Sequence, residues 1–121
     1  MTLQELYEKA EGSYEAARKV MMMDSLIGRM IVKLPEDKTF GKLMAAGEAM
    51  DTAGLFEEAH ALKGVAGSLG LTKLSALAGE ITEEYRPGKP RTMSDEEVKG
   101  KLEEIRTLYE RTMECIREYQ M

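Results

Sequence analysis

Three prolines limit where this 121-residue chain can form helices. They lie at positions 35, 87 and 90, so long proline-free stretches precede, separate and follow them. Proline ends or kinks a helix because it lacks a backbone N–H and clashes with the preceding turn. The chain has two phenylalanines, five tyrosines, no tryptophan and few β-branched residues, which favours helix over strand. The run from Arg86 to Pro90 is predicted to be a flexible loop.

Apolar residues recur at helical spacing within the proline-free stretches. We predict a short helix over about residues 2–10 and bundle helices over about 13–34, 38–69 with a break near 51, 71–86 and 94–120. Asp51 can cap the helix after the break, and Ser94 to Glu97 resembles a capping box. Helices joined by short connections pack as antiparallel bundles. The predicted fold is therefore all-α, an antiparallel four-helix bundle with a short accessory N-terminal helix, in one domain over residues 1–121.

The charge and the apolar pattern argue against several classes of partner. The net charge is −5, whereas nucleic-acid binding needs a basic surface. The most apolar stretch, 20–32, is interrupted by Asp24 and Arg29 and is too short to span a bilayer. The N-terminal segment lacks the basic start and apolar run of an export signal. We expect a cytoplasmic monomer that contacts neither nucleic acid nor membrane.

The sulfur-containing side chains have two predicted uses. Cys115 is the only cysteine, so no internal disulfide can form, and it falls in the apolar stripe of the last helix. We expect it to be a buried structural thiol. The consecutive methionines Met21, Met22 and Met23 could form an adaptable binding surface or fill gaps inside the bundle. Of these two, we expect packing inside the bundle.

His60 is the only histidine and lies in the predicted helix that follows Asp51. On a helical wheel the apolar side chains of that helix form one stripe, which must face the core: Leu55, Ala59, Leu62, Ala66 and Leu69. Lys63, Gly64 and Gly67 fall within about 60° of His60, and His60 itself lies about 100° or more from that stripe. We therefore predict that His60 faces outward.

The two glycines beside His60 are unusual in a helix, because each costs about 1 kcal/mol relative to alanine. Glycine there either allows close packing of a neighbouring helix or clears space for a partner or phosphoryl group. Since both lie opposite the core stripe, we favour the second interpretation. Lys63 is one turn from His60, so its ammonium could pair with phosphoryl oxygens. A neutral imidazole has a free nitrogen that can attack phosphorus.

The run His60-x-Leu62-Lys63-Gly64-x-x-Gly67-x-Leu69-Gly70 resembles the signature of histidine phosphotransfer (HPt) domains. These domains are intermediate carriers in bacterial two-component phosphorelays. The segments 43–48 and 56–59 are also similar, so the resemblance covers about residues 14–85. It implies a bundle whose histidine accepts phosphate from a receiver-domain aspartate and passes it to another receiver. The implied partners are response-regulator receiver domains and hybrid histidine kinases.

By position, the resemblance implies a role for each residue around the histidine. His60 is the phosphoacceptor, Lys63 steadies the phosphate, and Gly64 and Gly67 keep the imidazole accessible. Phe56 lies about one turn before His60, where it is either a docking contact or a partly buried residue at the bundle edge.

Some members of the family carry a glutamine on the next helix, which hydrogen-bonds the second nitrogen of the histidine. This chain offers Glu80, Thr82 and Glu83 in that region. Which of them orients the ring, if any, is left open.

The alternative is a helical adaptor in which His60 is never phosphorylated. Autokinase activity is not expected, because the chain has no glycine-rich nucleotide loop. No metal or other cofactor is expected either, since one histidine with Glu57 is an incomplete ligand set. The Met1 start and the long last helix favour a free-standing protein over a module of a larger hybrid kinase.

Overall fold

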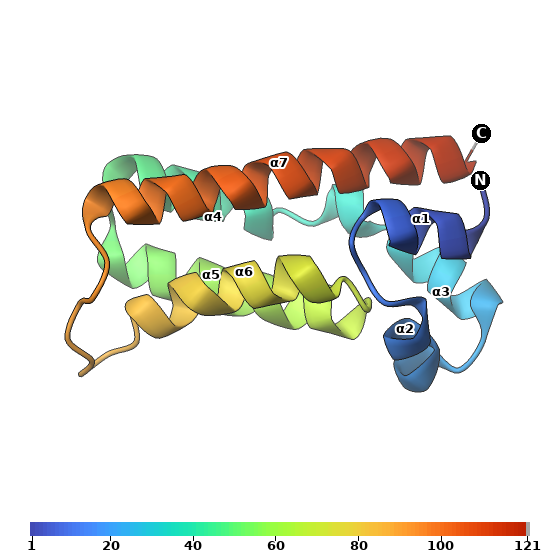
Figure 1. Ribbon diagram of the computed structural model, residues 1–121, viewed down its shortest axis with the longest axis horizontal. Helices are drawn as coiled ribbons and strands as arrows, with labels where there is room; N and C mark the ends of the chain where they lie inside the picture. The colour runs from blue at the N-terminus through green and yellow to red at the C-terminus, as the bar shows by residue number, and fades with distance from the viewer. Residues whose placement is uncertain (121) are drawn as a thin grey trace.

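The computed structural model describes residues 1–120, and every regular element in them is helical (Figure 1). The elements are α1 (Leu3–Lys9), α2 (Tyr14–Met21), α3 (Asp24–Ile31), the 3₁₀ helix η1 (Leu34–Glu36), α4 (Thr39–Ala49), α5 (Thr52–Ser68), α6 (Thr72–Glu84) and α7 (Asp95–Gln120). The predicted all-α fold is confirmed. No helix within residues 1–120 is long and apolar enough to cross a membrane.

The helices form four antiparallel rows around one core (Figure 1). Helices α5 and α6 lie side by side, and α7 runs the length of the bundle above them. At 1.5 Å per residue, α7 is about 39 Å long. The fourth row is made of α3, η1 and α4 in succession. Helix α1 packs against α7 at the end of the bundle where the N- and C-termini lie.

The predicted single helix over 13–34 is wrong, because the chain breaks between α2 and α3. Met22 ends α2 in the left-handed conformation with φ 68°, and Met23 is extended. Contacts across the break hold it: the Tyr14 hydroxyl donates to Asp24 Oδ1, and Arg18 Nη1 lies 3.0 Å from the same oxygen. A continuous helix would carry Asp24 past both partners.

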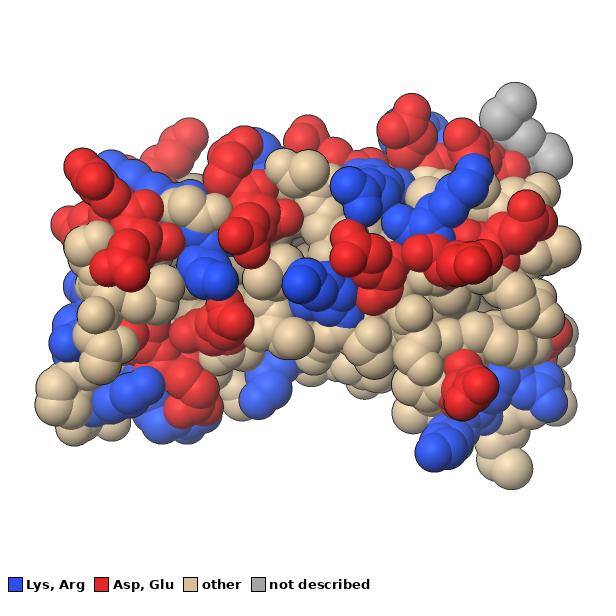
Figure 2. All heavy atoms as spheres, viewed as in Figure 1, with Lys and Arg blue, Asp and Glu red and all other residues tan. Residues whose placement is uncertain are grey.

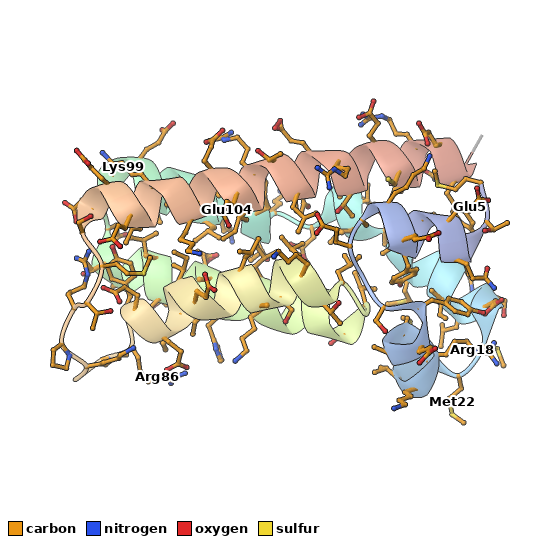
Figure 3. The ribbon with its side chains drawn as sticks, in the orientation of Figure 1. Glu5, Arg18, Met22, Arg86, Lys99 and Glu104 are labelled. Carbon is orange, nitrogen blue, oxygen red and sulfur yellow. The ribbon has the colours of Figure 1, made fainter. Side chains whose placement is uncertain are left out.

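The break also contradicts the expectation that Met21, Met22 and Met23 fill gaps in the bundle. Met22 is 75% exposed and Met23 is 54% exposed, whereas Met21 is partly buried. Met22 projects into solvent at the end of α2 (Figure 3).

The break predicted near residue 51 is confirmed as a tight turn between α4 and α5. Met50 adopts the left-handed conformation at the end of α4. Asp51 then caps α5, and its side chain accepts a hydrogen bond from the Gly54 N–H at 3.1 Å. The two helices consequently run antiparallel, which places the first turn of α5 at one end of the bundle.

The core consists of the predicted apolar stripes of the long helices. Fully buried side chains come from α5, α6 and α7: Leu55, Leu62, Leu74, Ile81, Ile105 and Ile116. Cys115 is buried as expected, and its burial raises the pKa of the thiol, which suits an unreactive structural cysteine.

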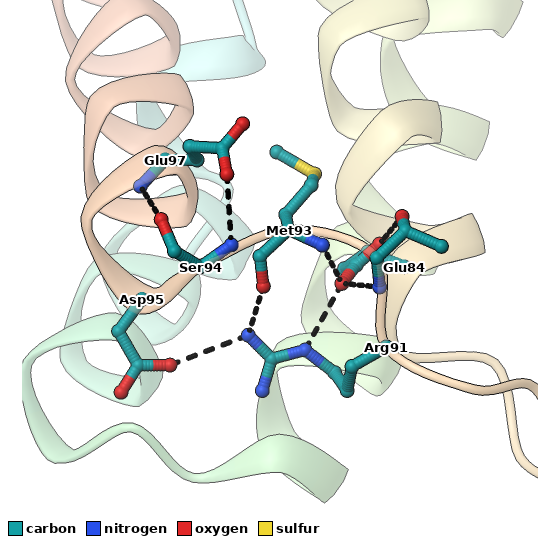
Figure 4. A network of polar contacts seen from close by, with 7 residues as sticks. Glu84, Arg91, Met93, Ser94, Asp95 and Glu97 are labelled. Carbon is teal, nitrogen blue, oxygen red and sulfur yellow. Dashed lines mark hydrogen bonds and ion pairs between the residues drawn. The ribbon is translucent and has the colours of Figure 1, made fainter.

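The loop between α6 and α7 is anchored by a buried carboxylate (Figure 4). Glu84 accepts hydrogen bonds from Arg91 Nε at 3.0 Å, from the Thr92 hydroxyl at 2.7 Å, and from the N–H groups of Thr92 and Met93. Burial alone would raise the pKa of Glu84, but these donors outweigh it and lower the pKa to about 2. These bonds hold the segment 91–93, which directly follows the predicted flexible loop of residues 86–90.

The capping box predicted at the start of the last helix is confirmed. The Ser94 N–H donates to Glu97 Oε1 at 3.0 Å, and the Glu97 N–H donates to Ser94 Oγ at 3.1 Å. Figure 2 shows acidic and basic side chains interspersed over the face that α7 forms, without a large basic patch on that face.

Candidate functional site

His60 lies on the outer face of α5, as the helical wheel predicts. The opposite face of the same helix is buried through Leu55, Ala59, Leu62 and Ala66. His60, Lys63, Gly64 and Gly67 are all exposed. Helix α5 therefore presents one histidine to solvent on a scaffold that its core face holds rigidly.

The two glycines beside His60 have different surroundings. A Cβ atom placed on Gly64 would meet nothing within 4 Å, so no neighbouring helix requires glycine there. A Cβ on Gly67 would lie 3.4 Å from the Ser75 Oγ of α6. A Cβ at Gly67 would thus make a van der Waals contact with α6, whereas Gly64 has open space beside it.

Helix α6 supports the site through a fixed register with α5. The Ser75 hydroxyl donates to the Lys63 carbonyl oxygen at 3.0 Å. The aliphatic stem of Lys63 then passes over Gly79, where a Cβ would lie 3.6 Å from Lys63 Cδ. Extended by one turn, the spacing of the Gly67–Ser75 and Lys63–Gly79 pairs aligns His60 with about residue 82 of α6.

The Phe56 ring stacks beside the His60 ring on the side toward the start of α5. The Phe56 and His60 rings are nearly parallel, with an interplanar angle of 7° and centroids 5.8 Å apart. The guanidinium carbon of Arg86 lies 5.6 Å from the Phe56 ring centroid. Glu83 holds this guanidinium through hydrogen bonds at 3.1 Å from Nε and 2.7 Å from Nη2.

The three residues considered as partners of the second imidazole nitrogen are engaged elsewhere. Thr82 is buried and its hydroxyl donates to the Ala78 carbonyl oxygen of its own helix. Glu80 pairs with Lys101 of α7 at 3.0 Å, and Glu83 pairs with Arg86. The His60 ring is thus stacked on Phe56 and receives no hydrogen bond from these three residues.

The charges around His60 are balanced between α5 and α6. The hydrogen bond from Arg86 lowers the pKa of Glu83, burial opposes this, and the positive charges of Arg86, Lys89 and Lys63 lower it further. Glu83 therefore remains a carboxylate under the influence of three cationic side chains, of which Arg86 is bonded to it directly. Of these cations, Lys63 lies one helical turn from His60.

A shallow groove adjoins the same face of α5. Gly64, Val65 and Ser68 line it on one side, and Met30 and Leu34 line it on the other. Gly64 lines this groove and also lies one turn from His60, so no side chain at position 64 separates the two.

The sequence matches the family model of the Hpt domain over residues 20–114. The chain belongs to the Hpt domain family. Members of this family carry phosphoryl groups on histidine in two-component phosphorelays, where they interact with receiver domains and kinases. The comparisons found no match among curated protein sequences and none among solved structures.

The family match leaves α1 and most of α2 outside the Hpt region. The Tyr7 hydroxyl of α1 donates to the carbonyl oxygen of Leu69 at the end of α5. The segment before the Hpt region therefore fastens the end of the helix that carries His60.

Sequence reasoning missed three residues of α6 and its C-terminal end that shape the site: Ser75, Gly79 and Arg86. None belongs to the run around His60, and their helical periodicity does not tell which α5 residue each one meets. Only the register between the two helices reveals these pairings. The contact between Phe56 and His60 was easier to predict from the sequence, because residues four apart on a helix are neighbours.

Proposed function

We propose that His60 of this Hpt domain accepts a phosphoryl group from a receiver-domain aspartate and passes it to the aspartate of another receiver. The observation that supports this most strongly is the exposure of the only histidine, on a rigid helix, next to a position where no side chain intrudes. A structural histidine would more often be buried and hydrogen-bonded.

The transfer needs only chemistry that an imidazole can supply. The unprotonated ring nitrogen attacks the phosphorus of the aspartyl phosphate, an N–P bond forms, and the P–O bond to the aspartate breaks. The aspartate leaves as a carboxylate, and the second imidazole nitrogen keeps its proton. The reverse reaction loads the next receiver. Phosphoryl transfer depends mainly on in-line positioning and charge neutralisation, much of which a receiver with its own Mg²⁺ can provide.

Lys63 is proposed to neutralise part of the charge that the phosphoryl group brings. It is exposed and lies one turn from His60, and its stem is guided over Gly79. Its ammonium acts as a point charge, so it can follow the phosphoryl oxygens without the fixed geometry of a guanidinium.

The groove beside Gly64 is proposed to receive the receiver's docking helix. Its lining is largely apolar, and it places a partner next to His60 on the side away from Phe56. Loading and unloading would then depend on partners, and the chain itself would have no kinase activity.

A pulse–chase experiment tests the relay. The chain is loaded with radiolabelled phosphate from one phosphorylated receiver and Mg²⁺, repurified, and mixed with a second, unlabelled receiver. We expect the label to leave the chain and appear on the second receiver. His60→Gln should not be loaded, and Lys101→Gln, on α7, should behave as wild type. Label that enters but never leaves toward any receiver would contradict a relay.

A further inference from the structure

The exposure of His60 leaves the orientation of its imidazole ring to be explained. The ring can rotate about two side-chain bonds, and an exposed side chain samples several rotamers. In-line attack on a receiver-bound phosphorus requires one nitrogen to point along one direction. The three residues of α6 considered as hydrogen-bond partners of the ring are engaged in other bonds.

Phe56 is the aromatic neighbour that can restrict the ring. Its side chain is half-buried at the edge of the bundle, so its own rotation is limited. It lies one turn before His60, and the two rings are within 7° of parallel. Aromatic pairs at such separations have a definite geometric preference. The half-buried Phe56 ring can therefore restrict the orientation of the exposed His60 ring.

Arg86, which lies just after the C-terminal end of α6 (Figure 3), contacts Phe56. Its guanidinium lies within the range of a cation–π contact with the Phe56 ring. Two hydrogen bonds to Glu83 fix the guanidinium in turn. The order Glu83, Arg86, Phe56, His60 thus links the end of α6 to the imidazole on α5.

We propose that Phe56 is a positioning residue for phosphotransfer, which sets the plane of the His60 imidazole by stacking and is itself held by Arg86. This inference rests on the proposed role of His60 as phosphoacceptor. Phe56 is the partly buried residue at the bundle edge that its sequence position allowed, and the proposal adds to this a role in orienting His60. Phe56 contacts the nucleophile, so its loss should slow the transfer within a docked complex and leave docking itself unchanged.

The stack can be observed without any activity measurement. His60 is the only histidine, so its two carbon-bound ring protons give unique resonances in an NMR spectrum. We expect cross-relaxation between these protons and the Phe56 ring, and an upfield ring-current shift. Phe56→Tyr should keep the shift, and Phe56→Leu should remove it. Unchanged His60 resonances in Phe56→Leu would overturn the proposal.

The kinetic arm separates positioning from docking. Transfer from a phosphorylated receiver is followed at increasing receiver concentration, to obtain the saturated rate and the half-saturating concentration. Phe56→Leu should lower the saturated rate about 2- to 10-fold, the range that the strength of an aromatic pair allows, at the same half-saturating concentration. Phe56→Tyr should restore the rate, and Arg86→Gln should lower it less than Phe56→Leu does.

Matched controls come from the other side of the bundle. Phe40→Leu removes the ring that stacks on Tyr109, and Arg106→Gln removes the other exposed Arg–Glu pair with the same spacing. Both should leave the saturated rate unchanged. Urea denaturation of each variant shows that the domain compared is folded.

Each outcome bears on a different claim. A higher half-saturating concentration with an unchanged saturated rate makes Phe56 a docking contact and overturns positioning. Equal rates for wild type and Phe56→Leu overturn it as well. If wild type is never labelled on His60 by a receiver, the proposed function fails, while the NMR arm still reports on the stack.

Discussion

Replacing Gly64 by alanine should stabilise the protein, because the structure shows no packing reason for glycine at this position. Gly64 lies inside α5, is exposed, and would place its new methyl group in open space. Glycine costs about 1 kcal/mol relative to alanine in a helix interior. The free energy of unfolding should therefore rise by up to about 1 kcal/mol, which for a chain of this size raises Tm by about 4 °C.

Gly100 provides a matched control for this substitution. It lies inside α7, is exposed, and a Cβ atom placed on it would also meet nothing within 4 Å. Urea denaturation should show Gly64→Ala and Gly100→Ala stabilising the domain by similar amounts. If Gly64→Ala destabilises while Gly100→Ala stabilises, Gly64 has a packing role and the reasoning is refuted.

The same pair of sites separates stability from function. A leucine at 64 stands one turn from His60 on the same face and should obstruct an approaching receiver. Gly64→Leu should slow phosphotransfer by about 10- to 100-fold, the scale of a small misplacement of reacting groups. Gly100→Leu should transfer at the wild-type rate. Equal rates for the two leucine variants would mean that Gly64 does not serve access.

Three further substitutions test the charge beside His60, the buried carboxylate that anchors the loop before α7, and a left-handed backbone position. Lys63→Ala should slow transfer about 2- to 10-fold, the loss of one charge-assisted contact, while Lys73→Ala should not. For Glu84→Gln, urea denaturation at several pH values should show a free energy of unfolding that falls less with acidification than that of wild type. The lowered pKa of Glu84 adds stability above about pH 4.5, and up to about 3 kcal/mol of it is lost toward pH 2. Gly70→Ala should cost at least about 2 kcal/mol in urea denaturation, because φ is +77° and the new Cβ would lie 2.8 Å from Ala17.

The helical faces were predictable because periodicity depends on a single helix. The wheel for α5 separates His60 and Lys63 from the buried side chains as the structure does. The turn at Asp51 and the capping box at Ser94 were predictable for a similar reason, since a cap acts within one turn.

The break after α2 was not predictable from local sequence. No glycine or proline marks it, and a methionine in the left-handed conformation is uncommon. Its stabilising contacts join Tyr14 and Arg18 to Asp24, and they exist only once the chain has turned. The contact of Arg86 with Phe56 is similar in kind, because it depends on how α6 is aligned with α5.

Phosphorylation of His60 by a receiver is the measurement that tests the account most directly. Phosphorylated receiver domains from the protein's own genome are mixed with the chain and Mg²⁺, and the modified residue is located by mass spectrometry. We predict an acid-labile, alkali-stable phosphoryl group on His60 of the wild type and none on His60→Gln. Phosphoramidate, a small donor that needs no docking, confirms that the imidazole can be reached. Equal labelling of His60→Gln, or loading by phosphoramidate but by no receiver, would contradict the central claim.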